Sequence, residues 1–475
     1  MNILILGYGL EGKSAENYFK SDPNLSEHTK IDILDNFTPE DLQSRDFSNY
    51  DLIFRTPSVR PDLIPAPKEK ITSVTKFFFS NCKAKIIGVT GTKGKGTTCT
   101  LIRDILEALN RKGETLFEEG PELRRGLARD TRDGGLARRA SRTEFRPFLV
   151  GNIGTPALDA LPTITENDVV IYELSSFQLW DLEKSPSVAV ALRIEPDHLD
   201  VHKDFEEYLS AKENITRYQS ESDSLVYFKD NKNTFTLASL SKAKKFPYPL
   251  EEKSPLLNEA LSSLKIPGAH NKENAEAALL ACAAFLNLDL ETFLTENFSE
   301  VSSALANFKP LPHHIEFVRE LNSVKYYDDS FSTVLPSLEA AIKSFPKTPL
   351  VLIAGGKDKG VDVEPVKRLI FDNPYLIKAV LIGETAEKLS KNEDPEKFYL
   401  AGTDFDDAVK KARSFAETYL TRAEENSDTC LVDAKKPIVS PVILLSPCAS
   451  SFDMFKSYKD RGDIFKTLVK NLKEN

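Results

Sequence analysis

The residues best suited to chemistry stand at 90–98, where the sequence reads TGTKGKGTT. Glycines at this density let the backbone turn tightly and direct N–H groups inward, where they bind an anion together with the positive end of a following helix. Lys95 is placed to reach the outer phosphates of a nucleotide. A glycine-rich turn without a ligand is the alternative. The pattern favours a nucleotide site, because a strand-like run precedes the loop and a helix-compatible run follows it.

The loop departs from the usual phosphate-loop spacing at one position. Gly96 follows Lys95, where a Ser or Thr normally holds Mg²⁺. We therefore expect Thr97 or Thr98, or another group, to take that role.

Two further strand-like runs end in charged side chains. Residues 168–172 lead into Glu173, and a carboxylate at a strand end beside a phosphate loop commonly holds Mg²⁺. The run 188–194 leads into EPDHLDVH at 195–202, with three acids and two histidines, for which a solvated loop is the alternative. Lys212 falls on a predicted helix shortly afterwards. Glu173 therefore predicts a Mg²⁺ site beside the phosphate loop, and the segment 195–202 predicts a polar cluster at a second strand end.

Polar residues also open an Ala-rich predicted helix at 275–285. His270 and Asn271 precede this helix. Both residue types cap helices, but an Asn can also bind an adenine edge, so the two interpretations stay open.

The N-terminal segment carries a dinucleotide-type fingerprint. Gly7, Gly9 and Gly12 follow a strand-like run, and Asp35 ends the next strand, as in domains that bind NAD. The segment is only about 80 residues long, half of a full dinucleotide domain. A Rossmann-like half that binds another phosphate ligand, or none, is therefore the alternative to NAD.

From about residue 308 onward, strand-like and helix-like runs alternate, which predicts a second, mostly parallel sheet. Polar segments follow its strands at 328–330, 355–360 and 446–451, where α/β proteins place functional groups. Five of the six histidines are predicted to lie in strand-end segments and not in the cores: His198, His202, His270, His313 and His314.

The length and composition predict a soluble globular protein of two to four domains. The chain of 475 residues is too long for one core, and 41% hydrophobic with 28% charged residues is typical of globular proteins. The net charge of −10 argues against nucleic acid as the main partner, with a local basic patch as the alternative, and no apolar run reaches the roughly 20 residues that span a bilayer. Five scattered cysteines without a C-x-x-C pair fit a reducing cytosol.

Residues 111–146 differ in composition from the rest of the chain. They hold nine of the 20 arginines but a single lysine. Because 124–146 shows little apolar periodicity, we predict a mobile insertion there, with a basic loop that approaches a phosphorylated ligand as the alternative. Residues 247–266, rich in Pro, Glu and Lys, are predicted to form a surface loop.

Eight motifs in register resemble those of the Mur ligases, and most closely the members that add D-glutamate. They are TGTKGKGTT, NIGTPALD, YELSSFQL, EPDHLDVH, GAHNKENA, DDSFST, GGKDKG and LLSPCASSFDMF. The resemblance covers nearly the whole chain except 113–146. It implies three α/β domains: a Rossmann-like uridine-diphosphate domain at 1–84, a central P-loop ATPase-type parallel-sheet domain at 85–307, and a C-terminal Rossmann-like amino-acid domain at 308–475.

The resemblance also implies a reaction in peptidoglycan precursor synthesis. The γ-phosphate of ATP would pass to the carboxylate of UDP-N-acetylmuramoyl-L-alanine, and the amine of D-glutamate would attack the acyl phosphate. ATP and Mg²⁺, at two sites, would be required, because two anionic reactants need cations between them. The expected partners are these small molecules, without nucleic acid or membrane, and the expected enzyme is a cytoplasmic monomer.

Position by position, the resemblance implies four groups of site residues. The catalytic group would be Lys95, Glu173, His198 and Lys212, with Thr97, Glu173, His198 and a carbamylated Lys212 as metal ligands. The ATP group would be Thr92, Lys93, Gly94, Lys95, Gly96, Thr97, Thr98, Asn271, His314 and Asp329. The uridine-sugar group would be Leu10, Asn152, Ser175 and Gln178, and the D-glutamate group would be Thr333, Lys359, Ser451 and Tyr458.

Four positions depart from the family pattern. Besides Gly96, His314 stands where the family usually has an Arg, Phe331 where the D-glutamate-adding members usually have a Lys, and Tyr458 in place of a Phe. The His314 change replaces a fixed bidentate donor by a group whose charge depends on pH. The alternatives are a related ligase with another amino acid or acceptor, a nicotinamide-dependent oxidoreductase, and an inactive binding protein.

Overall fold

The computed structural model describes residues 1–118, 145–360, 362–391, 394–428 and 439–474. They form three separate sheets within two compact units. The first unit comprises residues 1–265 and 271–308, and the second comprises 266–270 and 309–475. The three α/β parts agree with the expected fold class, whereas the domain limits at 84 and 307 stay predictions.

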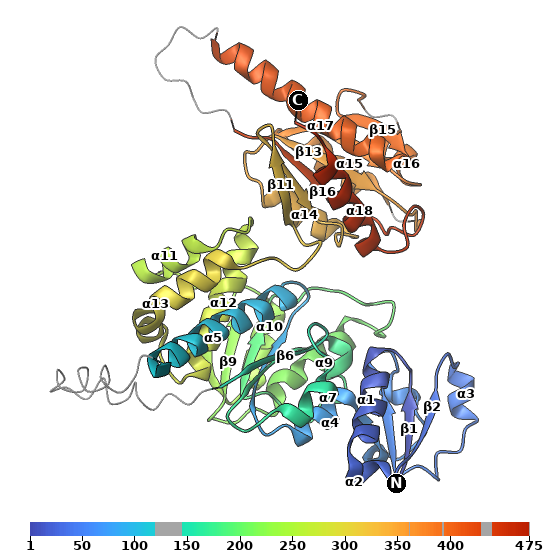
Figure 1. The fold of residues 1–475 in the computed structure, drawn as a ribbon. Helices are drawn as coiled ribbons and strands as arrows, with labels where there is room; N and C mark the ends of the chain where they lie inside the picture. Colours follow the sequence, from blue (N-terminus) through green and yellow to red (C-terminus); the bar gives the residue numbers. More distant parts are fainter. Residues whose placement is uncertain (119–144, 361, 392–393, 429–438, 475) are drawn as a thin grey trace, which may run out of the picture. The chain divides into compact units, whose positions relative to one another are not determined.

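The N-terminal sheet has four parallel strands in the order β2-β1-β3-β4 (Figure 1). The strands are β1 (Asn2–Leu6), β2 (Lys30–Leu34), β3 (Leu52–Arg55) and β4 (Ile71–Ser73). The helices are α1 (Leu10–Ser21), α2 (Pro23–Ser26), α3 (Pro39–Gln43) and α4 (Val74–Asn81), with short 3₁₀ turns η1 (Pro61–Leu63) and η2 (Lys68–Lys70). The turn after β1 needs glycine, because Gly7 has φ +84° and a Cβ there would lie 2.2 Å from Thr56 Oγ1.

The central sheet has six parallel strands in the order β10-β9-β8-β5-β7-β6. The strands are β5 (Lys85–Thr90), β6 (Pro147–Gly151), β7 (Val169–Glu173), β8 (Val188–Ala191), β9 (Ser224–Phe228) and β10 (Lys244–Tyr248). The four inner strands β9, β8, β5 and β7 are largely buried, as expected for parallel strands that are covered on both faces.

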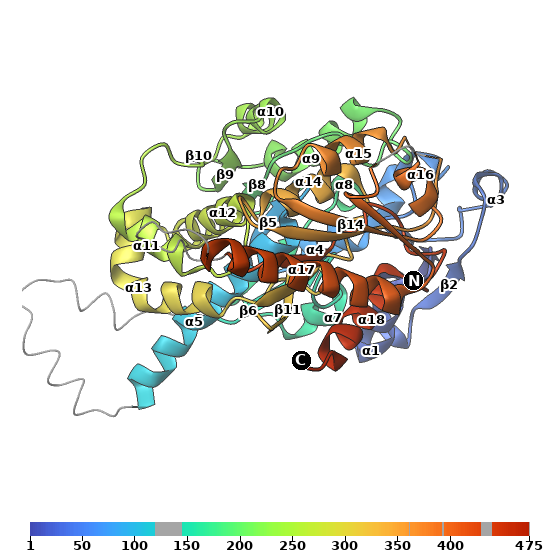
Figure 2. The ribbon, with the colours of Figure 1, turned by 90° about the horizontal axis from the view of Figure 1, so that it is seen from above.

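Helices connect and follow the strands of this central sheet. They are α5 (Lys95–Glu118), α7 (Ala157–Ala160), α8 (Ser176–Leu179), α9 (Phe205–Arg217), α10 (Lys232–Leu240), α11 (Pro255–Ser263), α12 (Ala269–Phe285) and α13 (Leu290–Asn307), with the 3₁₀ turn η4 (Leu161–Thr163). Helices α5 and α13 lie side by side in two perpendicular views (Figure 1, Figure 2). No single helix among the described residues is long and apolar enough to cross a membrane. Helices α12 and α13 reach the length and apolar composition of a membrane span only when counted together, and they are bent by 106° to each other.

The C-terminal sheet has six strands in the order β11-β12-β16-β13-β14-β15, parallel except for the antiparallel pair β11 and β12. The strands are β11 (Glu316–Leu321), β12 (Val324–Asp328), β13 (Leu350–Gly355), β14 (Leu376–Ile382), β15 (Phe398–Gly402) and β16 (Val442–Leu445). The helices are α14 (Leu335–Lys343), α15 (Glu364–Phe371), α16 (Ala386–Ser390), α17 (Phe405–Asp428) and α18 (Tyr458–Asn471). The mostly parallel sheet predicted for this region is confirmed.

Two segments differ from their sequence-based predictions. The predicted surface loop at 247–266 contains helix α11, because Pro255 and the N-cap Ser254 start a helix that buries Leu257 and Leu261. The predicted insertion at 111–146 begins as the last part of α5, and Arg146 at its other end binds Asp168 at 2.8–3.0 Å. Residues 119–144 lie outside the described residues.

A buried arginine joins the N-terminal sheet to the central sheet within the first unit. Arg55, at the end of β3, is fully buried. It donates from Nε to Asp181 Oδ2 at 2.8 Å and from Nη2 to the Phe177 carbonyl at 3.1 Å. A buried guanidinium needs such partners, because an unpaired buried charge is strongly destabilising.

Candidate active site

The phosphate loop connects β5 to α5 and requires glycine at two positions. Gly91 has φ +154°, and a Cβ there would lie 2.6 Å from Leu192 Cβ. Gly94 has φ +83°, and a Cβ there would lie 2.5 Å from the side-chain oxygen of Asn274. The loop can therefore pack closely against its neighbours, and it leads into the N-terminus of a helix of 24 residues. This arrangement can bind an anionic phosphate.

The approach of Asn274 to the loop was not expected from the sequence. Asn271, the predicted adenine-binding residue, is buried one turn earlier on the same helix, α12. Side chains three residues apart on a helix lie on the same face, so both amides are presented from one side of α12. The spacing N-x-x-N could have indicated this second residue.

Lys95 is the first residue of α5 and turns back over the loop. Its Nζ donates to the carbonyls of Gly91 and Thr92, each at 3.1 Å. Desolvation lowers the pKa of Lys95, and the Glu173 carboxylate opposes this shift. Thr97 is half-buried, whereas the Thr98 hydroxyl is buried without a hydrogen-bond partner in the described structure. Lys93 is exposed beside them, and Gly96 is half-buried.

Glu173 ends β7, whose pairing with β5 brings it beside the phosphate loop. Val89 of β5 is the register partner of Glu173. One carboxylate oxygen accepts a hydrogen bond from Asn152 Nδ2 at 3.2 Å, and the other is buried without a partner among the described residues. Burial raises the pKa of Glu173, and the charge of Lys95 opposes that rise. The free buried oxygen is a suitable ligand for a hard cation.

Lys212 reaches the same loop from helix α9. It is 1% exposed, and its Nζ donates to Thr90 Oγ1 at 3.2 Å and to the Gly91 carbonyl at 3.1 Å. Burial, and then the positive charge of Lys95, place the pKa of Lys212 well below its ordinary value of 10.5. Burial thus shifts this amine towards its neutral form.

The segment 195–202 contains polar side chains near the phosphate loop and one buried histidine. Asp197 was not singled out as a site residue from the sequence. Its carboxylate lies near enough to influence the pKa values of both Lys95 and Lys212. His198 has φ +55° and is half-exposed, with its ring 5.0 Å from that of Phe177.

His202 is the buried histidine of this segment, so the prediction that its side chain lies outside the core is wrong. It is 2% exposed, its Nε2 pairs with Ser176 Oγ at 2.9 Å, and its ring stacks on Phe177 at 5.2 Å. His313 is also buried, at 4% exposure, so the same prediction is wrong there.

The predicted uridine-sugar residues come from both α/β parts of the first unit. Ser175 and Gln178 form a capping box at the start of α8, and Asn152 binds Glu173. Gln178 Nε2 donates to Glu11 Oε1 at 2.7 Å, which links α8 to the first turn of α1, where Leu10 is 80% exposed. Desolvation raises the pKa of Glu11, and its second oxygen is buried without a partner in the described structure. Glu11 is a site candidate that the sequence did not reveal.

Three positions that depart from the family pattern lie together in the second unit: His314, Phe331 and Tyr458. The ring of His314 stacks on Phe331 with centroids 4.2 Å apart, and Phe331 meets Tyr458 edge to face at 5.2 Å. Three of the four departures from the family pattern are thus joined, with Phe331 in contact with both His314 and Tyr458. His313 Nδ1, beside them, pairs with Asp328 Oδ2 at 2.7 Å.

The remaining D-glutamate residues differ in exposure. Ser451 is buried, Thr333 is half-buried and Lys359 is exposed. The segment that carries Lys359 is tied to the Ser451 segment, because Lys357 N donates to the Ser450 carbonyl at 2.9 Å.

Asp329 is buried and accepts hydrogen bonds from Ser446 Oγ at 2.8 Å and Ile315 N at 3.2 Å. Desolvation raises the pKa of Asp329 to about 8.

Because the folded-state pKa of Asp329 is raised, this group's contribution to stability is complete below about pH 4 and is lost as the pH rises through about 8. Asp329→Asn should therefore reduce the fall in Tm between pH 5 and pH 9 by about 2–4 °C. Differential scanning calorimetry checks this, with the exposed Asp372→Asn as control; equal pH profiles would contradict it.

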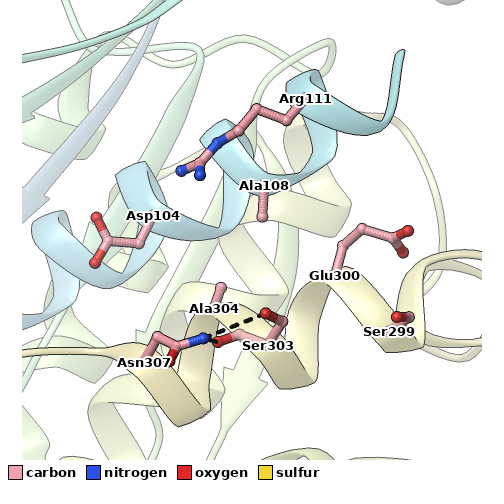
Figure 3. A pocket seen from close by; sticks show the side chains of 8 residues that line it. All are labelled: Asp104, Ala108, Arg111, Ser299, Glu300, Ser303, Ala304 and Asn307. Carbon is pink, nitrogen blue, oxygen red and sulfur yellow. Dashed lines mark hydrogen bonds between the residues drawn. The ribbon is translucent and has the colours of Figure 1, made fainter. Parts of the chain in front are cut away.

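A separate cavity of about 480 Å³ lies between α5 and α13 (Figure 3). Its lining residues are Asp104, Ala108, Arg111, Ser299, Glu300, Ser303, Ala304 and Asn307. None of the site residues predicted from the sequence is among them.

Comparison with known proteins identifies the family. Residues 89–282 match the family model of the Mur ligase middle domain. The chain is 35% identical over 452 residues to a protein of Ruminiclostridium cellulolyticum, covering 90% of this chain and 84% of the relative. It is 32% identical over 486 residues to one of Clostridium tetani, covering 98% and 92%. The chain belongs to the Mur ligase family. Both relatives are named UDP-N-acetylmuramoylalanine–D-glutamate ligase.

Solved structures show the same fold at lower sequence identity. MurF from Acinetobacter baumannii superposes with a TM-score of 0.54 at 14% identity, covering 92% of this chain and 89% of that one. A folylpolyglutamate synthase from Mycobacterium tuberculosis, complexed with ADP, gives a TM-score of 0.50 at 13% identity, covering 85% and 94%.

Proposed function

We propose that this protein is an ATP-dependent ligase that joins D-glutamate to UDP-N-acetylmuramoyl-L-alanine in peptidoglycan precursor synthesis. The proposal is carried by one observation. Lys95, Glu173 and Lys212, from three different elements, meet beside the glycine-rich loop that follows β5. The names of the relatives supply the substrates. Because ATP would be the phosphate donor, we propose that the reaction takes place in the cytoplasm, and the monomeric state stays a prediction.

The proposed reaction has two steps. A carboxylate oxygen of the alanyl group attacks the γ-phosphorus of ATP, a P–O bond forms, and ADP leaves. The neutral amine of D-glutamate then attacks the acyl carbon, an amide bond forms, and inorganic phosphate leaves with loss of one amine proton to solvent. Lys95 would compensate charge on the transferred phosphoryl group, and the loop N–H groups would orient ATP.

The residues at this site fit Mg²⁺, which we propose at two positions. The unpartnered buried oxygens of Glu173 and Thr98 are hard ligands, and Asp197 adds negative charge nearby. Mg²⁺ would neutralise the charge between the two anionic reactants. Thr97, Glu173, His198 and a carbamylated Lys212 would hold it. As a cation, Lys212 would oppose a metal, so the neutral amine favoured by burial supports carbamylation there.

The other assignments follow the same proposal. Asn271, His314 and Asp329 would contact the nucleotide, with Asn274 added from the structure. Leu10, Asn152, Ser175 and Gln178 would line the uridine-sugar site. Thr333, Lys359, Ser451 and Tyr458 would hold D-glutamate.

A second candidate function is a Mur-type ligase with another amino acid. Phe331 favours it, because this position lacks the cation usual in D-glutamate-adding members and the ring instead packs between His314 and Tyr458. The amino-acid specificity therefore needs its own measurement.

Phosphate release from ATP with UDP-N-acetylmuramoyl-L-alanine tests the proposal. We would offer D-glutamate, L-glutamate, L-alanine, L-lysine and meso-diaminopimelate in parallel. Release with D-glutamate alone is the expected result. Release with another amino acid would favour the second candidate, and no release with any of them would contradict both.

A further inference from the structure

We propose that Arg60 is a positioning residue that couples the N-terminal sheet to the segment 195–203, which carries Asp197 and His198. This inference rests on the proposed function, in which that segment contributes to the metal site. Arg60 follows β3 and directly precedes the 3₁₀ turn η1, so it belongs to the part of the chain assigned to the uridine group.

Every N–H group of the Arg60 guanidinium is committed. Nη1 donates to the Val201 carbonyl at 2.8 Å and to Glu207 at 3.2 Å, and Nη2 donates to Glu207 at 2.7 Å. Nε and Nη2 each donate to Asp62 at 3.0 Å. Five donors thus meet five acceptors, which is the full capacity of an arginine. A lysine has one nitrogen and cannot reproduce this planar set.

These contacts hold the far end of the 195–203 segment. Val201 lies within it, and Glu207, which binds Arg60, also accepts a hydrogen bond from Lys203 N at 2.7 Å. Glu207 stands in the first turn of α9, the helix that carries Lys212. Arg60 therefore fixes both the segment and the helix start to which it is joined.

The near end of the segment is held by the phosphate loop. Thr92 Oγ1 donates to the Glu195 carbonyl and accepts from Glu195 N, both at 2.9 Å. Between these two anchors the chain makes a turn in which Val201 N and His202 N both donate to the His198 carbonyl, at 3.1 and 2.9 Å. The position of His198 therefore depends on the phosphate loop at one end and on Arg60 at the other.

Aromatic packing completes the connection. The Arg60 guanidinium lies over the Trp180 ring at 4.8 Å, and the Trp180 ring lies 4.5 Å from that of His202. Such cation–ring contacts are directional and are weakened when the planar group is lost. A shift of β3 and its following turn would thus be passed from the Arg60 guanidinium to the segment by two routes, the hydrogen bonds to Val201 and Glu207 and the contact with Trp180.

The test is Mn²⁺ binding in the presence of a non-hydrolysable ATP analogue, followed by electron paramagnetic resonance. Arg60→Lys should raise the Mn²⁺ dissociation constant about fivefold, below the roughly 10–100-fold seen when a direct partner of a metal ligand is changed. Arg217→Lys is the matched control, since Arg217 forms an exposed ion pair with Glu213 on the same helix. It should leave Mn²⁺ affinity unchanged.

Glu207→Gln provides a second test that keeps the arginine. It should also weaken Mn²⁺ binding, and adding Arg60→Lys to it should cost less than Arg60→Lys alone, because the two residues act through one contact. Thermal unfolding of each variant measures any general loss of stability. Mn²⁺ affinity that equals the control in both variants, with or without a lower Tm, would overturn the proposal.

These measurements need neither D-glutamate nor the uridine substrate. A wild-type protein that releases no phosphate with D-glutamate would contradict the proposed function, while the dependence of Mn²⁺ binding on Arg60 would still be measured.

Discussion

Replacing Lys212 by alanine is expected to lower kcat at least about 100-fold, because this position would lose a metal-facing anion. The amine is buried, and burial lowers its pKa well below 10.5, which raises the share of the neutral form that attacks CO₂. In that step the amine nitrogen forms a bond to the CO₂ carbon and one proton passes to water, which leaves a carbamate anion. The lysine then carries the charge that suits Mg²⁺ ligation.

Carbon-13 NMR of the protein in ¹³C-bicarbonate measures the modification directly. We expect one carbamate resonance in the wild type that is absent in Lys212→Ala and present in Lys20→Ala, where an exposed lysine of α1 is removed. Acidification should remove it, because protonation of the amine opposes carbamate formation. Acetate should restore part of the lost activity by placing a carboxylate in the vacated space. An unmodified, fully active wild type would contradict the prediction.

Lys95→Ala should lower kcat about 10³-fold, which corresponds to about 4 kcal/mol of lost transition-state stabilisation. Charge on the phosphoryl group in transfer would lose its closest fixed cation on the loop. Because the lysine also donates to the loop carbonyls of Gly91 and Thr92, nucleotide affinity should fall too.

The matched control for this variant is Lys93→Ala. Lys93 stands two residues earlier on the same loop but is exposed, so its removal should change kcat less than about tenfold. Single-turnover phosphate release separates the chemical step from nucleotide binding, which equilibrium titration measures. Equal losses in the two variants would show that only the overall charge of the loop matters.

The sequence was most informative where local backbone chemistry determines structure. The loop at 90–98 could be recognised because glycine density, a lysine and a strand-to-helix transition are all local signals. Glu173 could be placed beside it because the carboxyl ends of parallel strands share one edge of a sheet.

What could not be predicted depended on contacts between distant segments. His202 looks like a ligand beside Asp200 and His198, but Phe177 and Trp180, more than 20 residues away, bury it. Arg60 could not be singled out either, since only Asp62 among its partners is local, and Val201 and Glu207 lie 141 and 147 residues further on. The α11 helix was missed because charged residues precede its short apolar face.

The length of α5 sets its two ends far apart. The helix starts at Lys95 and ends at Glu118, and 24 residues at 1.5 Å each span about 36 Å. Its first turn is bound to the phosphate loop, while its last turn leads into the arginine-rich segment. Insertion of a fluorescent reporter after Glu118 would therefore label the enzyme at a distance from its nucleotide, which makes this junction a suitable attachment point for following ligand binding without altering it.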